Sequence, residues 1–210
     1  MSRIVPADAA GIAEAAAALR RGGLAVMPTD TVYGLAARAA DPEALTKLYR
    51  AKGRDAGKPV AMLVSGVEAV RRAGAALPPA AEKLAAAFWP GALTLVVPSA
   101  APGMWDAFRV PDCAAALALL EAVGEPLAVT SANKSGEAPA KSARAAADAL
   151  GDWPEILLDA GDLPETNVAS TVVKVEGDRL VVLRLGAVTQ EMLSRAAGLP
   201  AVLAGAVRSC

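Results

Sequence analysis

The sequence predicts a single α/β domain, because short apolar runs alternate with alanine-rich segments along nearly the whole 210-residue chain. Apolar residues make up 54% of the chain and charged residues 20%, with a formal net charge of −1. This composition is typical of a globular protein with one sizeable core. The sequence contains no internal repeat, long charge run or separate linker. We therefore expect one domain over residues 1–200 and a C-terminal tail over residues 201–210.

The N-terminal part begins with a predicted helix over residues 8–21, which ends at a glycine pair. A short apolar run through Met27 then predicts a strand. Asp41 and Pro42 are suited to the N-cap and first turn of a second helix, which reaches Lys52. Proline, glycine and apolar runs place the next elements, which are a strand over 59–64, helices over 67–76 and 79–88, and a strand over 92–97.

The C-terminal part continues the alternation and contains a predicted hairpin. Residues 170–184 form two β-rich runs joined at Gly177 and Asp178, which are typical turn residues. A last helix is expected over residues 189–197, and residues after Pro200 are expected to fray. The elements expected before the hairpin are a strand over 107–110, a helix over 113–123, a strand over 126–130, a helix over 142–150 and an extended segment over 156–159.

Composition excludes several kinds of chemistry. The chain has no histidine, which removes the usual neutral-pH general base, the commonest zinc ligand and every Ser-His or Cys-His arrangement. Cys113 and Cys210 are the only cysteines, too few for a disulfide framework or a metal cluster, so we expect a reducing compartment. Any catalysis must therefore use other side chains.

The charge balance and the hydropathy of the sequence limit the kinds of partner that we expect for the protein. The balance of 21 basic and 22 acidic residues argues against a protein that grips nucleic acid by bulk electrostatics, so any RNA contact has to be local. No stretch approaches the roughly 20 apolar residues needed to cross a bilayer. We expect a cytoplasmic protein with no membrane contact.

Polar side chains gather at the ends of predicted strands. Residues 28–35 read Pro-Thr-Asp-Thr-Val-Tyr-Gly-Leu, where Pro28 fixes φ and Gly34 permits a close backbone approach. Strand ends in an α/β sheet share a crevice, where hydroxyls and amides can fix a small substrate while Lys and Arg neutralise phosphate. The polar segments placed in this way are 28–31, 52–58, Arg109, 130–133, 170–171 and Arg184.

Structural explanations exist for several of these residues taken singly. Lys52 and Arg54 follow a predicted helix, where basic residues often complement the helix dipole. Arg109 and Arg184 follow apolar strands and could cap a sheet edge, and Ser131-Ala132-Asn133 is ordinary turn composition. The run at 28–35 is more specific, because Thr-Asp-Thr between proline and glycine is unusual for a simple turn. Their joint occurrence favours a ligand site.

Several motifs together resemble those of the YrdC-like threonylcarbamoyl-AMP synthases (TsaC). The resemblance covers roughly residues 8–190, and the motifs occur in the family's order and spacing. They are P-T-D-T-V-Y-G-L from Pro28, K-G-R from Lys52 with K-P at Lys58, W-P-G-A-L-T from Trp89, R-V-P-D from Arg109, T-S-A-N-K-S-G from Thr130, S-T-V-V from Ser170 and L-R-L-G from Leu183.

The resemblance implies a fold, a reaction and a set of binding residues. The implied fold is a single-domain YrdC-like open twisted mixed sheet with helices around a large concave cavity. The implied reaction makes threonylcarbamoyl-AMP and pyrophosphate from L-threonine, bicarbonate and ATP, for the modification of adenosine 37 in tRNA. The family's L-threonine positions match Thr31, Arg109, Val129 and Ser170, and its ATP positions match Arg54, Lys58, Ser131, Asn133, Pro139 and Arg184.

The resemblance also implies catalytic residues and partners. Lys52 and Arg54 are the expected catalytic pair, with Mg²⁺ bound on the ATP phosphates and with no tightly bound organic cofactor. A histidine is not required, because a carbamate is already a nucleophile and the protein mainly has to align it with the α-phosphorus. The product is expected to pass to the tRNA threonylcarbamoyl-transfer machinery, and a weak contact with tRNA stays open.

Two other functions remain as alternatives. The first is a non-catalytic module that binds double-stranded RNA or tRNA, which predicts a basic face. The second is a carbamoyl-transfer domain like the one inside hydrogenase-maturation proteins, which normally belongs to a much longer chain with zinc-finger and acylphosphatase parts.

Overall fold

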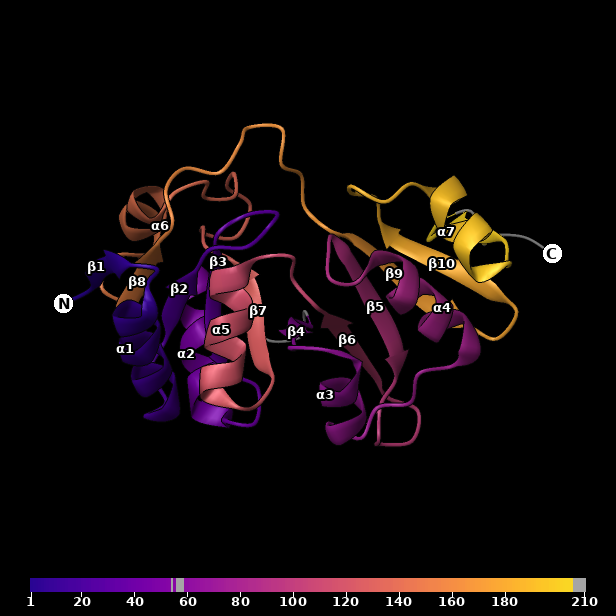
Figure 1. The fold of residues 1–210 in the computed structure, drawn as a ribbon, viewed down its shortest axis with the longest axis horizontal. Coiled ribbons are helices and arrows are strands. Elements are labelled where there is room, and N and C mark those ends of the chain that lie inside the picture. Colours follow the sequence, from indigo (N-terminus) through magenta and orange to yellow (C-terminus); the bar gives the residue numbers. More distant parts are fainter. Residues whose placement is uncertain (54, 56–58, 206–210) are drawn as a thin grey trace.

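The computed structural model describes residues 1–53, 55 and 59–205, and in this part of the chain eleven strands form one mixed sheet (Figure 1). The strand order is β1-β8-β2-β3-β7-β4-β6-β5-β9-β10-β11. The strands are β1 (Arg3–Pro6), β2 (Ala25–Met27), β3 (Gly34–Arg38), β4 (Ala61–Leu63), β5 (Leu93–Pro98), β6 (Trp105–Arg109), β7 (Leu127–Ser131), β8 (Ile156–Asp159), β9 (Thr171–Glu176), β10 (Arg179–Arg184) and β11 (Ala201–Leu203).

The described helices pack against this sheet, and their ends follow the capping signals in the sequence. Asp8 and Asp41 accept hydrogen bonds from the first turns of α1 and α2, and Gly53 ends α2 in the left-handed conformation. Ser142 and Thr189 cap two later helices in the same way. The helices are α1 (Ala9–Arg20), α2 (Pro42–Lys52), α3 (Val67–Arg72), α4 (Pro79–Phe88), α5 (Ala114–Val123), α6 (Ala143–Leu150) and α7 (Gln190–Ala197).

Strands β1, β8, β2, β3 and β7 form what we call the three-layered half, because helices cover both faces of the sheet there. Helices α1 and α5 pack on one face in a core that contains Leu19, Leu119 and Leu127. Helices α2 and α6 pack on the other face in a core around Leu48 and Leu157.

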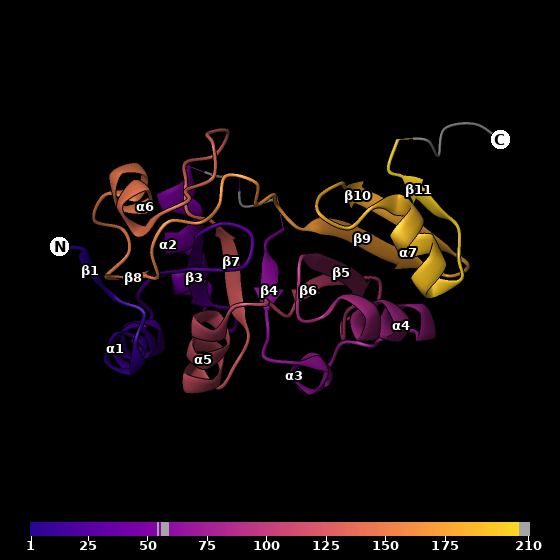
Figure 2. The same ribbon diagram turned by 45° about the horizontal axis from the view of Figure 1, so that its top comes forward.

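Strands β6, β5, β9, β10 and β11 form what we call the two-layered half, because helices α3, α4 and α7 share one apolar core on a single face (Figure 2). Leu95 and Phe108 lie in this core and pair across antiparallel strands. Since side chains alternate along a strand, Thr94 and Arg109 point to the opposite face, which no helix of the described chain covers. Strand β4 joins the two halves.

The structure confirms the α/β class and most of the expected elements within a few residues, including the antiparallel hairpin of β9 and β10. It adds three strands that we did not expect, β1, β3 and β11. It also corrects the expected tail, because Ala201–Leu203 pair in parallel with β10 and extend the sheet beyond residue 200. The expected helix over 67–76 ends at Arg72, followed by Gly74 with a φ of 81°.

Candidate active site

The loop that carries the Thr-Asp-Thr run joins β2 to β3 and is held by its own hydroxyl groups. The Thr29 hydroxyl accepts hydrogen bonds from the N–H groups of Thr31 and Val32, each at 3.1 Å, and donates to the Val32 carbonyl at 2.6 Å. The two threonine hydroxyls lie 3.0 Å apart, and both residues are buried. The hydroxyls therefore fix the turn and direct Thr31 inward.

Tyr33 anchors the same loop to the segment that follows β8. Its hydroxyl donates to the Gly161 carbonyl at 2.7 Å and accepts from the Ala160 N–H at 3.1 Å. Burial raises the pKa of this phenol, and the carboxylates of Asp159 and Asp162 act in the same direction. The loop is thus fixed at both ends, and Asn167 adds a bond to the Asp30 carbonyl at 3.1 Å.

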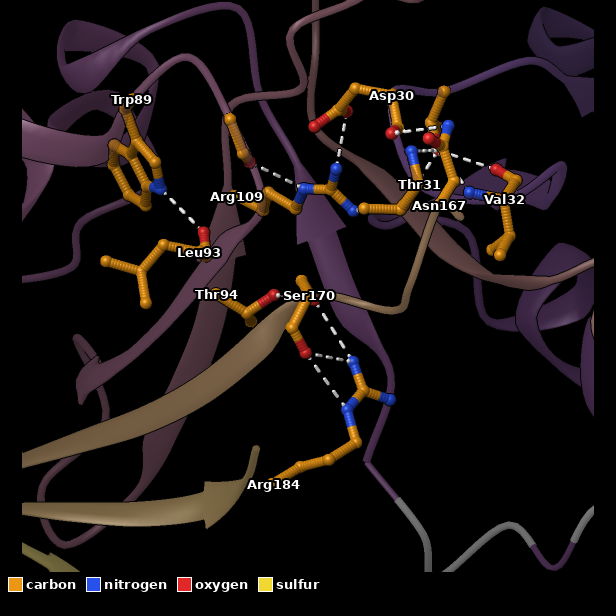
Figure 3. A network of polar contacts seen from close by, with 12 residues as sticks. Asp30, Thr31, Val32, Trp89, Leu93, Thr94, Arg109, Asn167, Ser170 and Arg184 are labelled. Atoms are coloured by element: carbon orange, nitrogen blue, oxygen red, sulfur yellow. Dashed lines mark hydrogen bonds and ion pairs between the residues drawn. The ribbon is translucent and has the colours of Figure 1, made fainter. Parts of the chain in front are cut away.

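Arg109 meets this loop from the end of β6, so it joins the two halves of the sheet (Figure 3). Its guanidinium donates from Nη1 to the Thr31 hydroxyl at 2.8 Å, from Nη2 to Asp30 Oδ1 at 2.5 Å and from Nε to the Gly91 carbonyl at 2.9 Å. Arg109 is only 6% exposed. A buried arginine with directed donors is suited to bind a carboxylate or a phosphate.

Ser170 lies immediately before β9 and connects Arg184 with Thr94. Its hydroxyl is 2.9 Å from that of Thr94 and accepts from Arg184 Nη2 at 3.0 Å. Arg184 also donates to the Ser170 carbonyl, from Nε at 3.1 Å and from Nη2 at 2.9 Å. Thr94 and Arg109 occupy the same face of adjacent strands, so this group lies beside the Arg109 group.

Lys52 lies at the end of α2 and is 2% exposed. Its ammonium donates to the carbonyls of Ser131 and Asn133 at 2.7 and 2.5 Å, and to the Asn133 side-chain oxygen at 3.1 Å. Asn133 in turn donates to the carbonyls of Lys134 and Glu137. These contacts hold Lys52 against the 131–133 loop, and the catalytic role that we expect for it stays a prediction.

The remaining predicted site residues lie in different surroundings. Val129 is half-buried in β7, where its side chain packs so closely over Gly34 that a Cβ at the glycine would be 2.6 Å from Val129 Cγ1. Pro139 is exposed in the loop before α6. Arg54 and Lys58 lie outside the described residues. The structure thus places Thr31 with Arg109 and Ser170 with Arg184 in two adjoining groups, and Lys52, Ser131 and Asn133 in a third.

Two hydroxyls that organise the site were given no role from the sequence, although Thr171 lies in the predicted polar segment 170–171. Thr94 is 3% exposed within an otherwise apolar strand, and this isolated polar position in Trp-Pro-Gly-Ala-Leu-Thr was the available signal. Thr171 is fully buried; its hydroxyl donates to the Val188 carbonyl and accepts from the N–H groups of Gly186 and Val188. Thr171 therefore shapes the turn that directly follows Arg184.

A hollow of about 470 Å³ lies away from these groups, on the helix-covered side of the two-layered half. Its lining is mostly apolar and includes Val67, Arg71, Ala85, Trp89 and Leu117. None of the predicted ligand residues that the structure describes lines it, so we assign the site by the hydrogen-bonded side chains and not by this hollow.

The fold and the site define a class of protein. Two arginines lie beside threonine and serine hydroxyls at strand ends of a mixed α/β sheet, an arrangement suited to small molecules that carry carboxylate or phosphate groups. No described helix is long and apolar enough to span a membrane.

A sequence model of the Sua5/YciO/YrdC family, which is described as telomere recombination, matches residues 17–186. The chain therefore belongs to this family. A relative from Mycobacterium tuberculosis, described as a putative threonylcarbamoyl-AMP synthase, is 41% identical over 199 residues, which cover 91% of each chain. The threonylcarbamoyl-AMP synthase of Bacillus subtilis is 36% identical over 89% of this chain and 56% of its own.

A solved structure of Pyrococcus abyssi Sua5 in complex with L-threonine has the same fold. It superimposes with a TM-score of 0.84 at 35% sequence identity. The match covers 91% of this chain and 58% of the archaeal chain, so the likeness concerns little more than half of that protein.

Proposed function

We propose that the protein is an L-threonylcarbamoyladenylate synthase, which forms threonylcarbamoyl-AMP and pyrophosphate from L-threonine, bicarbonate and ATP. Membership of the family and the names of relatives with 36–41% identity support this assignment. The observation that carries it is the neighbouring position of Thr31, Arg109 and Ser170, three of the residues that the family resemblance assigns to L-threonine. Arg109 donates to the Thr31 hydroxyl. Thr94, which contacts Ser170, lies on the strand next to that of Arg109.

The proposed reaction has two bond-forming steps. The threonine ammonium first loses a proton to solvent, and the free amine then attacks bicarbonate carbon, so that an N–C bond forms, a C–O bond breaks and water leaves. A carbamate oxygen then attacks the α-phosphorus of ATP, the bond between the α-phosphorus and the bridging oxygen breaks, and pyrophosphate leaves. The second step requires alignment and stabilisation of negative charge more than it requires a general base.

Different side chains of the described site bind the amino acid, neutralise the phosphates and position the ATP-binding loop. Arg109 and Thr31 hold the amino acid, and Ser170 lies between it and the nucleotide. Arg184, which already contacts Ser170, neutralises phosphate charge. Lys52 keeps the 131–133 loop in place for ATP. Mg²⁺ arrives with the ATP phosphates as part of the nucleotide substrate, since Mg²⁺ is commonly bound through substrate phosphates.

We further propose that the product passes to the machinery that transfers the threonylcarbamoyl group to adenosine 37 of tRNA. Such an acyl adenylate is an activated mixed anhydride, so it is suited to a second enzyme that supplies the tRNA nucleophile.

An end-point assay tests the assignment. The purified protein is incubated with ATP, Mg²⁺, bicarbonate and labelled L-threonine, and threonylcarbamoyl-AMP and pyrophosphate are measured together. We expect both products in equal amounts, with neither formed when bicarbonate or threonine is omitted. Pyrophosphate release that does not depend on threonine, or no product from a folded protein beside an active control enzyme, contradicts the proposal.

A further inference from the structure

Asp30 places a carboxylate directly beside the arginine of the proposed amino-acid site. Among the residues labelled in Figure 3, Asp30 carries the only negative charge. Its Oδ1 accepts from Arg109 Nη2 at 2.5 Å, and the two side chains are 16% and 7% exposed. An ion pair this close to a ligand site affects ligand charge as well as the position of the arginine.

Both members of this pair keep hydrogen-bonding capacity. A guanidinium has five N–H donors, and three of those of Arg109 are directed to Gly91, Thr31 and Asp30. One N–H on Nη1 and one on Nη2 therefore remain without a partner in the described part of the chain. Asp30 Oδ2 likewise accepts no hydrogen bond from the described residues.

The main chain of Asp30 is fixed, so its carboxylate is held at a defined place. Asn167 donates to the Asp30 carbonyl, and the neighbouring Thr29 and Thr31 hydroxyls close the turn. A ligand that binds Arg109 therefore meets an anion in a constant position, and does not need to displace it, because two arginine N–H groups are available.

A free α-amino acid has complementary charges, with an ammonium and a carboxylate on the same carbon atom. We propose that Arg109 and Asp30 form a zwitterion-binding pair, in which the remaining Arg109 N–H groups bind the substrate carboxylate and Asp30 Oδ2 accepts a hydrogen bond from the substrate ammonium. This inference rests on the proposed function and adds a residue to it. It explains why a net-neutral substrate is bound by a site in which arginine is already neutralised.

The pair also has a consequence for the reaction. Once the nitrogen is carbamoylated, it no longer carries a positive charge, and the new carbamate oxygens are negative. Asp30 attracts the substrate nitrogen and repels the carbamate. The released proton goes to solvent, and Asp30 is not required to act as a base. The same carboxylate therefore selects the free amino acid and directs the carbamate away from the loop.

Binding measurements with three ligands distinguish recognition of the substrate ammonium by Asp30 from a role in which Asp30 only positions Arg109. The ligands are L-threonine, (R)-3-hydroxybutyrate, which lacks the ammonium, and L-threoninol, which lacks the carboxylate. Binding of each to wild type, Asp30→Asn and Asp148→Asn is measured by ligand-observed NMR, with thermal unfolding as the folding control. Asp148 is an exposed carboxylate on α6 and serves as the matched control.

We expect Asp30→Asn to weaken L-threonine and L-threoninol at least tenfold, with (R)-3-hydroxybutyrate bound equally well or more tightly. Asp148→Asn should change none of the three. An equal loss for all three ligands in Asp30→Asn would show that Asp30 only positions Arg109, and no loss for any ligand would also overturn the pair.

If Asp30→Asn does not fold, a second variant provides the same test. Asp30→Ser also removes the carboxylate and must give the same pattern of two weakened ligands and one unaffected ligand. If wild type binds none of the three ligands, the proposed function fails. If wild type binds L-threonine and only the pattern among the variants is wrong, the zwitterion pair fails while the synthase assignment survives.

Discussion

In the three-layered half of the sheet, the described helices cover both faces, whereas in the two-layered half they cover only one (Figures 1 and 2). Thr94 and Arg109 point to the uncovered face, and loops instead of helices approach the sheet there. The loop with Thr31 comes from the three-layered half, and Ser170 begins a strand of the other half. The comparison indicates that the helix-covered faces stabilise the fold, and that the uncovered face next to β4, where the two halves meet, carries the side chains of the proposed active site.

The strongest test of this division is Arg109→Met, which removes the guanidinium from the uncovered face. We expect turnover with L-threonine to fall at least a hundredfold, a loss of about 3 kcal/mol, because the directed charge on the substrate carboxylate disappears. Steady-state measurement of pyrophosphate release gives this value, and ATP binding measured separately should change little. An unchanged affinity for L-threonine with a collapse of ATP binding would mean that the two substrate halves of the site are exchanged.

Two core substitutions test the other side of the comparison. Leu19 on α1 and Leu84 on α4 are fully buried in the cores of the three-layered and two-layered halves. Leu19→Ala and Leu84→Ala should each lower the free energy of unfolding by about 2–5 kcal/mol, through lost burial and the cavity left behind. Denaturant unfolding measures this cost. KM for both substrates should stay within about twofold of wild type at a temperature where the variants are folded. A large change in KM would contradict the separation between stabilising cores and a substrate-binding face.

A smaller effect is expected from Thr94→Val, which keeps the shape of a buried side chain but removes the hydroxyl next to Ser170. Ser170 then loses one partner while Arg184 remains bonded to it. We expect kcat/KM for L-threonine to fall about tenfold, close to 1.4 kcal/mol, with the larger part in KM.

Thr94→Ser retains a hydroxyl and provides the control for that variant. It should recover most of the lost kcat/KM, since the bond to Ser170 can form again. If Thr94→Ser is as impaired as Thr94→Val, the role of the residue is packing and the uncovered face does not need this hydrogen bond.

The sequence predicts the helices of both halves better than it predicts the strands. Caps such as Asp41 and Ser142 are local signals, so helix positions follow from them. Strand β3 was missed because Gly-Leu-Ala-Ala-Arg has little β propensity, and only the pairing with β2 and β7 makes it a strand. Strand β11 was missed because it has only three residues, and its pairing with β10 makes it a strand.

The site shows the same limit. Motifs identified Thr31, Arg109 and Ser170, whose contacts group them in the structure. They did not reveal that Lys52 is buried against Ser131 and Asn133, or that Asp30 pairs with Arg109, because both facts depend on contacts between residues 79 or more positions apart. Residue type along the chain indicates which groups are available, and only the fold decides which of them face one another.

The smallest predicted effect concerns Tyr33, whose hydroxyl ties the Thr-Asp-Thr loop to residues 160 and 161. Tyr33→Phe removes both hydrogen bonds and should lower the free energy of unfolding by about 1 kcal/mol near neutral pH. The pKa of this phenol is raised above its ordinary value of 10.0 by burial, so the neutral form is favoured in the folded state. Its stabilising contribution is therefore complete below pH 10 and is lost as pH rises through the higher folded pKa. Urea unfolding of wild type and Tyr33→Phe at several pH values should show a difference that is constant below pH 10 and shrinks above it, with Tyr49→Phe as the variant that leaves Tyr33 in place. A difference that stays constant through the alkaline range would indicate that the phenol ionises as readily in the folded chain as in the unfolded one, and that the loop is not fastened to the segment after β8 in the way the hydrogen bonds imply.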